Sequence, residues 1–311
     1  MNTVQLLVDG LAERLERPVG VDDRKFRAIA YSSHPSNIDS VRRDSILGRK
    51  APLAVTEWLE ALGVLSAESF VRIPANTDLD MVARVCFPLR FHGRLLGFLW
   101  LVEGADRYDD ETLAASQRVA TDLAEELYRL QQIERDERDR EADQVQRLLA
   151  GSGSDAAYPS MNGLGLAAAA VYGVIVIGLR LPARVPRPPG LDVRLTEAVD
   201  RARRSIQFRH QMASVSSGRA VVVVAAASAA ELRAHADTLL SATTQELSDL
   251  RDAEPVVGMG EAVETILRLA HAHQQAEMAV SLAGTVPALP SLVTWDQLGA
   301  LGLGGWCRTG F

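Results

Sequence analysis

Apolar residues recur at helical spacing at the start of the chain and then alternate as they do in strands. The first helix is predicted from apolar positions three and four residues apart, and Pro18 ends it: Val4, Leu7, Val8, Leu11 and Leu15. Strands are expected at residues 19–21 and 26–31, followed by helices at 38–47 and 53–62. The first part of the chain therefore mixes helices with short strands.

A hairpin then pairs residues 82–91 with residues 95–102 across His92-Gly93-Arg94. In its first strand, Arg84, Cys86 and Arg90 lie on the face opposite the apolar residues Ala83, Val85, Phe87, Leu89 and Phe91. In its second strand both faces are apolar, with Leu95, Leu99 and Leu101 on one and Leu96, Phe98 and Trp100 on the other. Such a strand is covered on both faces. We expect flanking helices on one face, and on the other either loops that close over a ligand cavity or a partner subunit.

A long helix is predicted over residues 109–150. Ser116, Ala120, Leu123, Leu127 and Leu130 keep the 4-3 spacing of a coiled-coil seam, whereas nine of the ten residues 134–143 are charged. One interpretation is a solvated connector held by ion pairs between residues four apart. The other is a signalling helix that pairs with its twin in a homodimer through Leu123, Leu127 and Leu130. Gly151-Ser-Gly-Ser154 then predicts a flexible joint.

The last part of the chain alternates strands with helices. Strands are expected at 171–181, in a hairpin over 211–224 with its turn at 216–219, at 256–257 and at 292–295; helices are expected at 195–206, 229–250 and 262–283. The central order is strand, helix, strand, strand, helix, strand. That order predicts an α+β, ferredoxin-like layer with its helices on one face of an antiparallel sheet.

Length and charge set outer limits on the class of protein. The 311 residues favour two domains, and a net charge of −7 gives no overall attraction to nucleic acid or anionic lipid. Cys86 and Cys307 have no CxxC partners, so neither a zinc site nor a disulfide framework is predicted. Cys86 is interpreted as a packed strand residue rather than a redox sensor.

No membrane partner is expected. Asp9, Glu13 and Glu16 interrupt any signal-peptide core, which predicts a cytoplasmic protein. Residues 156–179 carry no charge and are long enough to span a bilayer, yet the β-branched run at 171–177 favours a buried strand.

Several short motifs, in order along the chain, carry a family resemblance. Val257-Gly-Met-Gly260, Gln275-Ala-Glu-Met-Ala279 and Asp296-Gln-Leu-Gly299 resemble the GGDEF-like domain of PucR/CdaR-type bacterial transcription regulators. The first part is similar to the GAF-like domain that precedes it in many actinobacterial members. The residues that match it are Tyr31-Ser-Ser33, Ile38-Asp39, Arg42, Ile46-Leu47, Arg49, Pro52, Arg84-Val-Cys-Phe-Pro-Leu-Arg90 and Gly97-Phe-Leu-Trp100.

The resemblance implies a sensor and oligomerisation region in four parts. These are a GAF-like sensor domain at 1–108, a connector and dimerisation helix at 109–150, a degenerate GGDEF-like domain at 158–299 and a tail at 300–311. Such regulators normally continue into a helix-turn-helix domain, so DNA binding is expected only through a segment beyond Phe311 or through a partner. An unknown small molecule is the expected effector. The alternative is a stand-alone nucleotide- or metabolite-binding receptor that acts through a protein partner.

No enzymatic activity, catalytic residue or cofactor is expected. Active GGDEF cyclases hold metal ions on carboxylates at the end of the first strand and in the hairpin turn, but Gly178-Leu-Arg-Leu181 and Ser216-Ser-Gly-Arg219 contain no acid. His271 and His273 point in different directions on a helix, so no metal site is predicted. Gly258-Met-Gly260 lacks the third glycine of a dinucleotide fingerprint. The run Arg201-Ala-Arg-Arg204 is interpreted as a solvated helix face, with a nucleotide or partner contact as the alternative.

Candidate ligand-binding residues come from the first part of the chain. Arg84 and Arg90 share a strand face with Cys86, where they either bind an anionic effector or lie at the rim of the sheet. Within the motifs that resemble the GAF-like domain, the full candidate set is Tyr31, Arg84, Cys86, Arg90 and Trp100.

Overall fold

A computed structural model describes residues 3–33, 40–48, 51–103, 107–150, 170–182, 185–205, 211–250 and 252–300. The chain divides into two compact units, Met1–Arg135 (unit 1) and Asp136–Phe311 (unit 2). Each unit combines one five-stranded sheet with helices, so the prediction of an α+β fold is confirmed.

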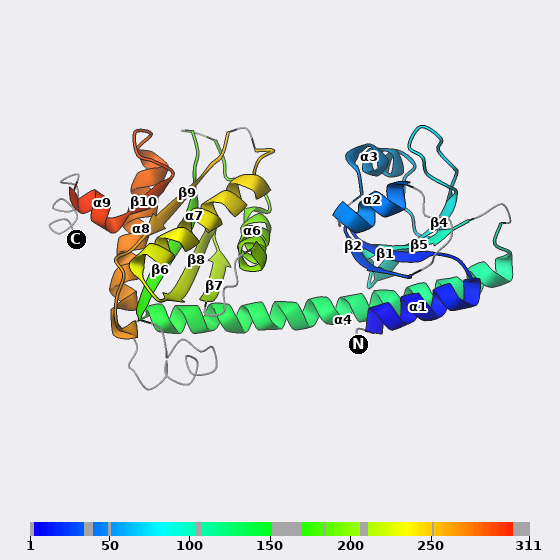
Figure 1. The fold of residues 1–311 in the computed structure, drawn as a ribbon, viewed down its shortest axis with the longest axis horizontal. Helices are drawn as coiled ribbons and strands as arrows, with labels where there is room; N and C mark the ends of the chain where they lie inside the picture. The colour runs from blue at the N-terminus through cyan, green and yellow to red at the C-terminus, as the bar shows by residue number, and fades with distance from the viewer. Residues whose placement is uncertain are drawn as a thin grey trace. The chain divides into compact units, whose positions relative to one another are not determined.

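Unit 1 contains an antiparallel sheet in the order β2-β1-β5-β4-β3. Its strands are β1 (Val19–Asp23), β2 (Ala28–Tyr31), β3 (Val71–Ile73), β4 (Arg84–Phe91) and β5 (Arg94–Val102). One face packs against α1 (Thr3–Leu15) and the first half of α4 (Asp110–Leu149), and the other packs against α2 (Ser40–Gly48) and α3 (Leu53–Ala61) (Figure 1). The pattern did not predict β3, which is only three residues long.

The β4–β5 hairpin confirms that its second strand is buried on both faces. His92 and Gly93 have positive φ and form the two-residue turn, so Arg94 belongs to β5 rather than to the turn. The predicted faces are confirmed except at Leu95 and Leu96, which lie on the opposite faces from those predicted. The register shifts between Leu89 and Arg90, which places Leu96 in the core on the α1 side. A bulge of one residue reverses the alternation, and nothing in the apolar pattern marked it.

Helix α4 differs from the expected exposed seam. Leu123 is 0% exposed and Leu127 is 5% exposed, both in the core of unit 1, and Leu130 packs against the same core. These leucines therefore face their own sheet rather than lying free for a twin helix, because the apolar α1-side face of that sheet needs cover. Homodimerisation of the chain stays a prediction, but this stripe is not an exposed surface for it.

Unit 2 contains a sheet in the order β10-β9-β6-β8-β7, antiparallel except for the β9–β10 pair. The strands are β6 (Val171–Arg180), β7 (Gln211–Ser216), β8 (Arg219–Ala226), β9 (Glu254–Met259) and β10 (Leu292–Thr294). The helices are α6 (Leu191–Ser205), α7 (Ala229–Glu246), η2 (Ile266–Arg268), α8 (Leu269–Thr285) and α9 (Trp295–Ala300). The predicted order of elements is confirmed, and the helix expected from residue 262 begins as η2 and α8.

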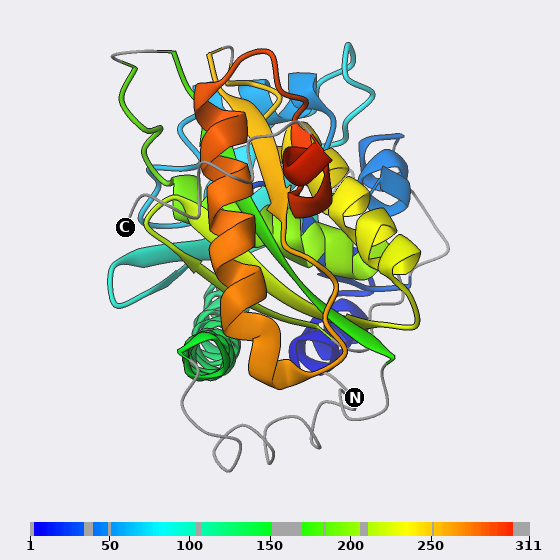
Figure 2. The same cartoon turned by 90° about the vertical axis from the view of Figure 1, so that its left-hand side faces the viewer.

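Helices lie on both faces of this sheet, although the two helices of the predicted central order, α6 and α7, share one face. Helices α6 and α7 cover one face, whereas α8 covers the other, as Figure 2 shows with α8 in front of the strands. Val145 and Leu148, near the end of α4, join the core on the α8 side. Strands β6 and β8 are apolar on both faces and therefore need helices on both.

The uncharged segment 156–179, which is long enough to span a bilayer, is partly described by the structure. Its second half is strand β6, and residues 156–169 lie outside the described residues. Among the described residues, the helices include none that is both long and apolar enough to cross a membrane.

Candidate functional site

Four of the five candidate ligand residues, all but Arg90, lie on the face of the unit 1 sheet that α2 and α3 cover. The strand registers place Cys86, Trp100, Gly20 and Tyr31 in one row across four strands, so their side-chain positions share that face. Cys86 and Trp100 are 0% and 6% exposed, whereas Tyr31 is 45% exposed on the edge strand β2. The row therefore runs from a buried centre to an open edge.

Aromatic rings surround Trp100. Phe26 and Phe98 stack with ring centroids 5.0 Å apart, and the Trp100 ring lies 5.8 Å from Phe98 and 6.4 Å from Phe26. The indole Nε1 of Trp100 is buried and has no hydrogen-bond partner in this part of the structure. A buried indole N–H normally finds an acceptor, so the unpaired donor makes Trp100 a candidate contact for a polar ligand atom.

Charged side chains stand beside the thiol of Cys86. Burial raises the pKa of this thiol well above its ordinary value; the Asp22 carboxylate raises it further, and the Arg84 guanidinium acts in the opposite direction. Arg84 is only 8% exposed, and its Nε donates a long hydrogen bond of 3.4 Å to the carbonyl of Val82. The face therefore combines an aromatic floor with one buried cation.

Arg90 does not belong to this cluster. Its Nε donates to the carbonyl of Ala67 at 2.9 Å, and its Nη2 donates to the carbonyl of Leu65 at 2.9 Å. It therefore anchors the loop before β3. This contact agrees with a position at the rim of the sheet rather than with binding of an anionic effector.

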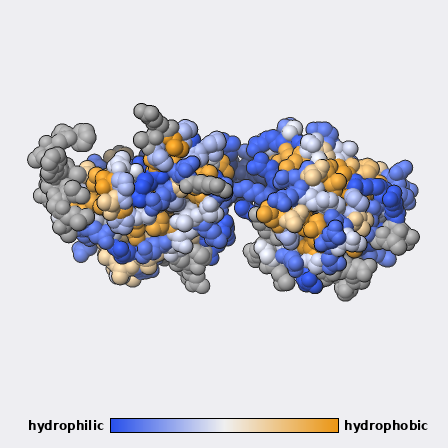
Figure 3. All heavy atoms as spheres, turned by 90° about the horizontal axis from the view of Figure 1, so that it is seen from above, coloured by the Kyte–Doolittle hydropathy of each residue, from blue (hydrophilic) through white to orange (hydrophobic). Residues whose placement is uncertain are grey.

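Sequence reasoning missed Asp22, Phe26 and Phe98 as members of the cluster. Phe98 was assigned to the correct face, but Asp22 lies in β1 just beyond the strand predicted at residues 19–21. Phe26 has a φ of 55°, a conformation that no apolar pattern indicates. On the outside of the molecule, Leu53 at the start of α3 is 70% exposed, and Figure 3 shows apolar and polar side chains interspersed over the surface of unit 1.

In unit 2, the hairpin turn and the end of β6 lie together, as the comparison with cyclases predicted. Ser217 and Gly218 form a two-residue turn with positive φ. A Cβ added to Gly178 would lie 1.7 Å from Nη1 of Arg219, so the guanidinium of Arg219 rests on the glycine backbone. Glu277 of α8 lies 4.0 Å from Arg219. The guanidinium of Arg219 therefore lies between the end of β6 and α8, paired with an acid of α8.

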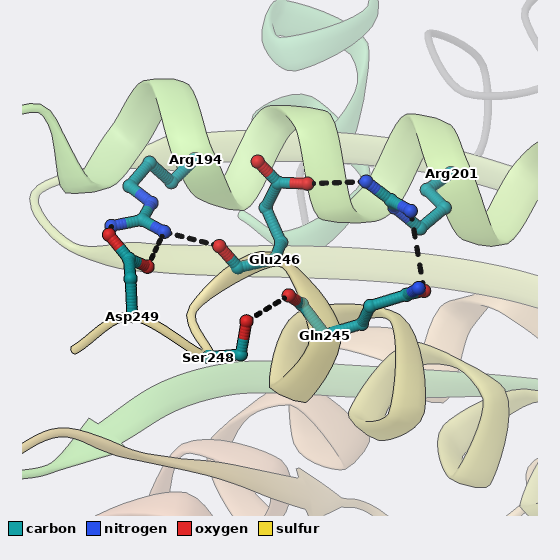
Figure 4. Close-up of polar contacts among 6 residues, drawn as sticks. All are labelled: Arg194, Arg201, Gln245, Glu246, Ser248 and Asp249. Carbon is teal, nitrogen blue, oxygen red and sulfur yellow. Dashed lines mark hydrogen bonds and ion pairs between the residues drawn. The ribbon is translucent and has the colours of Figure 1, made fainter. Parts of the chain in front are cut away.

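A cleft of about 620 Å³ opens at another edge of unit 2, between the end of β6 and the ends of α7 and α8. The guanidinium of Arg180 lines it and is fully engaged, with hydrogen bonds to the carbonyls of Ala283 and Leu289 and to Glu254. The same end of α7 is tied to α6. Figure 4 shows Arg194 bonded to Asp249 and to the carbonyl of Glu246, and Arg201 bonded to the Glu246 carboxylate. These contacts explain the local structure without a ligand.

The remaining motifs have structural explanations. A Cβ at Gly258 or Gly260 would lie 2.3 Å or 2.1 Å from backbone oxygens of α8, so these glycines permit close helix packing. His273 lies 3.6 Å from Glu277, and His271 pairs with Gln275, so the two histidines point apart as predicted. Within the described ranges, no group of three or more His, Cys, Asp or Glu side chains is placed to hold a metal ion.

Comparisons with known proteins point to transcription regulators. No family model matches this chain. The chain is 25% identical over 177 residues to the DNA-binding transcriptional activator AdeR of Bacillus subtilis (strain 168), covering 55% of this chain and 42% of AdeR. It is 22% identical over 152 residues to the proline-responsive transcriptional activator PutR of the same organism, covering 47% of this chain and 37% of PutR. The matches thus span less than half of each relative.

Solved structures give weaker likenesses. The cofactor-binding GAF domain of the nutrient sensor CodY from Clostridium difficile aligns with a TM-score of 0.30 and 16% identity, over 40% of this chain and 83% of that chain. The bacteriophytochrome RpBphP3 from R. palustris aligns with a TM-score of 0.35 and 13% identity, over 71% and 57%. PelD from Pseudomonas aeruginosa PAO1 aligns with a TM-score of 0.23 and 15% identity, over 82% and 81%. Scores this low carry no inference about the function of the chain.

Proposed function

We propose that this chain is the sensor and oligomerisation region of a PucR/CdaR-like transcription regulator. In this proposal unit 1 is a GAF-like domain that binds a small-molecule effector, α4 is the connector, and unit 2 is a degenerate GGDEF-like domain of ferredoxin-like topology. The protein acts in the cytoplasm as a homodimer. DNA contact comes from a segment outside this sequence or from a partner.

The likeness to two transcriptional activators supports the regulatory part of the proposal. The order of the four central strands supports the topology assigned to unit 2, because β9-β6-β8-β7 with its two crossover helices is the arrangement of a βαββαβ layer. Helix α8 and strand β10 are additions to that layer.

The observation that carries the effector site is the buried, unpartnered indole N–H of Trp100. It lies on the aromatic floor with Phe26 and Phe98, beside the buried guanidinium of Arg84. Apolar walls with a small number of polar groups are the usual lining of small-molecule sites. The preferred effector therefore has a flat or apolar body and at least one hydrogen-bond acceptor for the indole.

The proposal that unit 2 has no cyclase activity is supported by the charge at the hairpin turn. Metal-assisted phosphoryl transfer needs carboxylates that hold the metal ions. Here the guanidinium of Arg219 rests on Gly178, and the Arg187 side chain donates to the carbonyl of Ser217 in the turn. The nearby carboxylates of Asp192 and Glu277 are engaged by the Gly218 N–H and by Arg219, so among the described residues the two cations leave no free acidic pair for a metal ion here.

The proposed mechanism is a shift between two arrangements of the connector. An effector changes such an equilibrium only by the difference between its affinities for the two arrangements. Helix α4 is suited to carry the change, because its first half supplies Leu113, Ala120 and Leu123 to the core of unit 1 and its end supplies Val145 and Leu148 to the core of unit 2.

A thermal-shift screen of metabolites and signalling nucleotides tests the effector site. A ligand that binds only the native state at 100 times its Kd adds about 2.7 kcal/mol of stability. Trp100→Phe keeps the ring and removes the N–H, while Trp295→Phe in unit 2 is the matched control. We expect compounds that raise the midpoint of the wild type and of the control, with the shift lost in Trp100→Phe. Equal shifts in all three proteins would place the effector site elsewhere.

The alternative is a receptor that acts through a protein partner instead of DNA. It is favoured by the limited cationic surface of the basic run in α6, because Arg201 pairs with Glu246 and Arg203 pairs with Glu141. Fluorescence anisotropy with the native upstream DNA at physiological salt should show weak, non-specific binding under both hypotheses, so it tests the expectation that this chain does not itself read a DNA site. Whether a helix-turn-helix is encoded beyond Phe311 then decides between them.

A further inference from the structure

The second half of α4 lies along the open edge of the unit 2 sheet. Strand β7 is the last strand in the order β10-β9-β6-β8-β7, so among the described residues only one of its sides pairs with another strand. Glu141 of α4 contacts both β7 and α6, and one turn further on Val145 packs into the core on the α8 face. The helix thus passes across the strand edge, as Figure 1 also shows.

The register of the hairpin shows which amides of β7 point to that edge. Ser216 and Arg219 close the two-residue turn and form a hydrogen-bonded pair, and hydrogen-bonded pairs then alternate along the ladder. Ser214 and Met212 therefore bond to β8, whereas the N–H groups of Val215, Ala213 and Gln211 point outward. An open edge of this kind is a template for pairing with another strand.

The carboxylate of Glu141 covers the middle of this edge. Its Oε1 accepts the N–H of Ala213 at 2.8 Å, and its two oxygens also accept both terminal nitrogens of Arg203, one of them at 3.2 Å. The side chains of Glu141 and Arg203 are 23% and 26% exposed. A two-pronged, charge-assisted contact in a partly buried position is the strong form of an ion pair.

The rest of the charged stretch contributes less. Arg138 lies 3.4 Å from Asp200 of α6, with side chains 47% and 27% exposed, and such exposed pairs add little stability. Glu137, one turn before Glu141, is exposed. Glu141 is therefore the main polar contact of this stretch with the strand edge.

Some buried polar atoms where α4, α6 and β7 meet lack hydrogen-bond partners. Nε of Arg203 and the side-chain atoms Nε2 and Oε1 of Gln211 are buried and have no hydrogen-bond partner among the described residues. Buried polar groups without partners are costly, and a partly satisfied polar network is a weak point of a structure. Apart from the apolar contacts of Val145 and Leu148 with the core, the docked arrangement of α4 thus depends on few favourable polar contacts.

We infer that α4 is a removable cover of strand β7 and that Glu141 is the residue that holds it in place. Release of Glu141 frees the backbone N–H of Ala213, at the middle of the outward edge of β7, and breaks the ion pair between the connector and α6. The cover is a conformational device of unit 2, and its operation does not depend on which effector acts on unit 1.

Hydrogen exchange on the full chain, followed in peptides covering 134–149 and 211–216, tests the cover. Glu141→Ala removes both the ion pair and the cap on Ala213. We expect exchange to be about ten-fold faster in both peptides, while peptides from β6 and β8 keep their protection, because local opening is measured separately from global unfolding. Glu137→Gln, which changes one exposed acid on the same helix, is the matched control and leaves both peptides unchanged.

A second variant guards against a general loss of folding. Arg203→Gln removes the two-bond ion pair with Glu141 but keeps the Glu141 carboxylate that accepts the N–H of Ala213. We therefore expect faster exchange in residues 134–149 and a smaller effect on residues 211–216 than in Glu141→Ala. The inference is overturned if β7 keeps its protection in Glu141→Ala. It is also overturned if Glu137→Gln accelerates both peptides as much as Glu141→Ala does.

Discussion

At the scale of single residues, several positions that looked like candidates for chemistry serve packing. Gly258 and Gly260 lie in β9 and just after it, beneath α8, where an added Cβ would meet the carbonyl oxygens of Ala276 and Ala272. The motif resembled a phosphate-binding turn only because close backbone approach needs glycine in both settings.

Substitution at these glycines tests the packing explanation. Gly260→Ala places a methyl group 2.1 Å from a backbone oxygen, and overpacking of this kind costs about 1–3 kcal/mol. Urea unfolding should show that loss. Gly10→Ala in α1 is the control, because its Cβ meets nothing within 4 Å and alanine favours a helix by about 1 kcal/mol over glycine. A neutral Gly260→Ala would contradict the close packing.

The thiol of Cys86 is expected to be inert in the folded protein. Burial and the nearby Asp22 carboxylate raise its pKa above the ordinary value of 9.0, so very little thiolate forms near neutral pH. In a Cys307→Ser background, native protein at pH 8 should react with a thiol reagent at least roughly 100-fold more slowly than protein in urea. Rapid labelling of the native state would show that this face of the sheet opens.

The same pKa shift has a consequence for stability. The unfolded chain gives up the Cys86 proton at a lower pH than the folded chain, so between the two pKa values the folded state holds more protons. The stability contribution of the neutral thiol is therefore fully present below pH 9.0 and is lost as the pH rises above that value.

At the scale of elements, α4 shows how one helix can serve two cores. Its leucines at 4-3 spacing have the pattern of a coiled-coil seam, yet the same spacing suits an apolar stripe that covers a sheet. Leu123 and Leu127 lie in the core of unit 1, and the charged stretch that follows provides the Glu141 contact to β7. The helix is both a structural element of unit 1 and a cover in unit 2.

Leucine truncation separates the core stripe from an exposed seam. Leu123 is 0% exposed, so Leu123→Ala should cost about 2–5 kcal/mol of unfolding free energy in unit 1, measured by denaturant titration. Ile133→Ala is the control on the same helix, since Ile133 is 41% exposed and its loss should be small. If Leu123→Ala instead changed only the oligomeric state seen by light scattering, the stripe would be a dimer seam.

At the scale of the whole molecule, the two units differ in the polar side chains that they bring together. Unit 1 buries a cation, a thiol and an indole N–H on one face of its sheet, whereas unit 2 pairs Arg219, beside its hairpin turn, with an acid of α8. A net charge of −7 gives no general attraction to nucleic acid. This division supports binding in unit 1 and a structural role for unit 2.

An assay for cyclase activity tests the proposal for unit 2. Purified chain incubated with GTP and magnesium should form no cyclic dinucleotide, because the end of β6 and the hairpin turn supply no metal-binding carboxylate. An active diguanylate cyclase run in parallel is the control for the assay. Product that depends on magnesium and on the protein would contradict the proposal for unit 2.

The sequence alone determined most elements and the order in which they occur. Apolar spacing located α1, the long helix and both hairpins, because the periods of 3.6 and 2 follow from local backbone geometry. The turn residues Gly93 and Gly218 marked the hairpins, since positive φ suits glycine. The sequence also showed that the hairpin turn of unit 2 contains no carboxylate.

Only the tertiary structure decided what each apolar face covers and which polar groups meet. The Leu123 stripe, the bulge at Leu96 and the position of α8 on the second face depend on contacts between residues far apart in the chain. The same is true of the cluster around Trp100 and of the contact between Glu141 and Ala213, 72 residues apart. A periodic pattern states that a face is buried, but the partner that buries it is chosen by the packing of the whole unit.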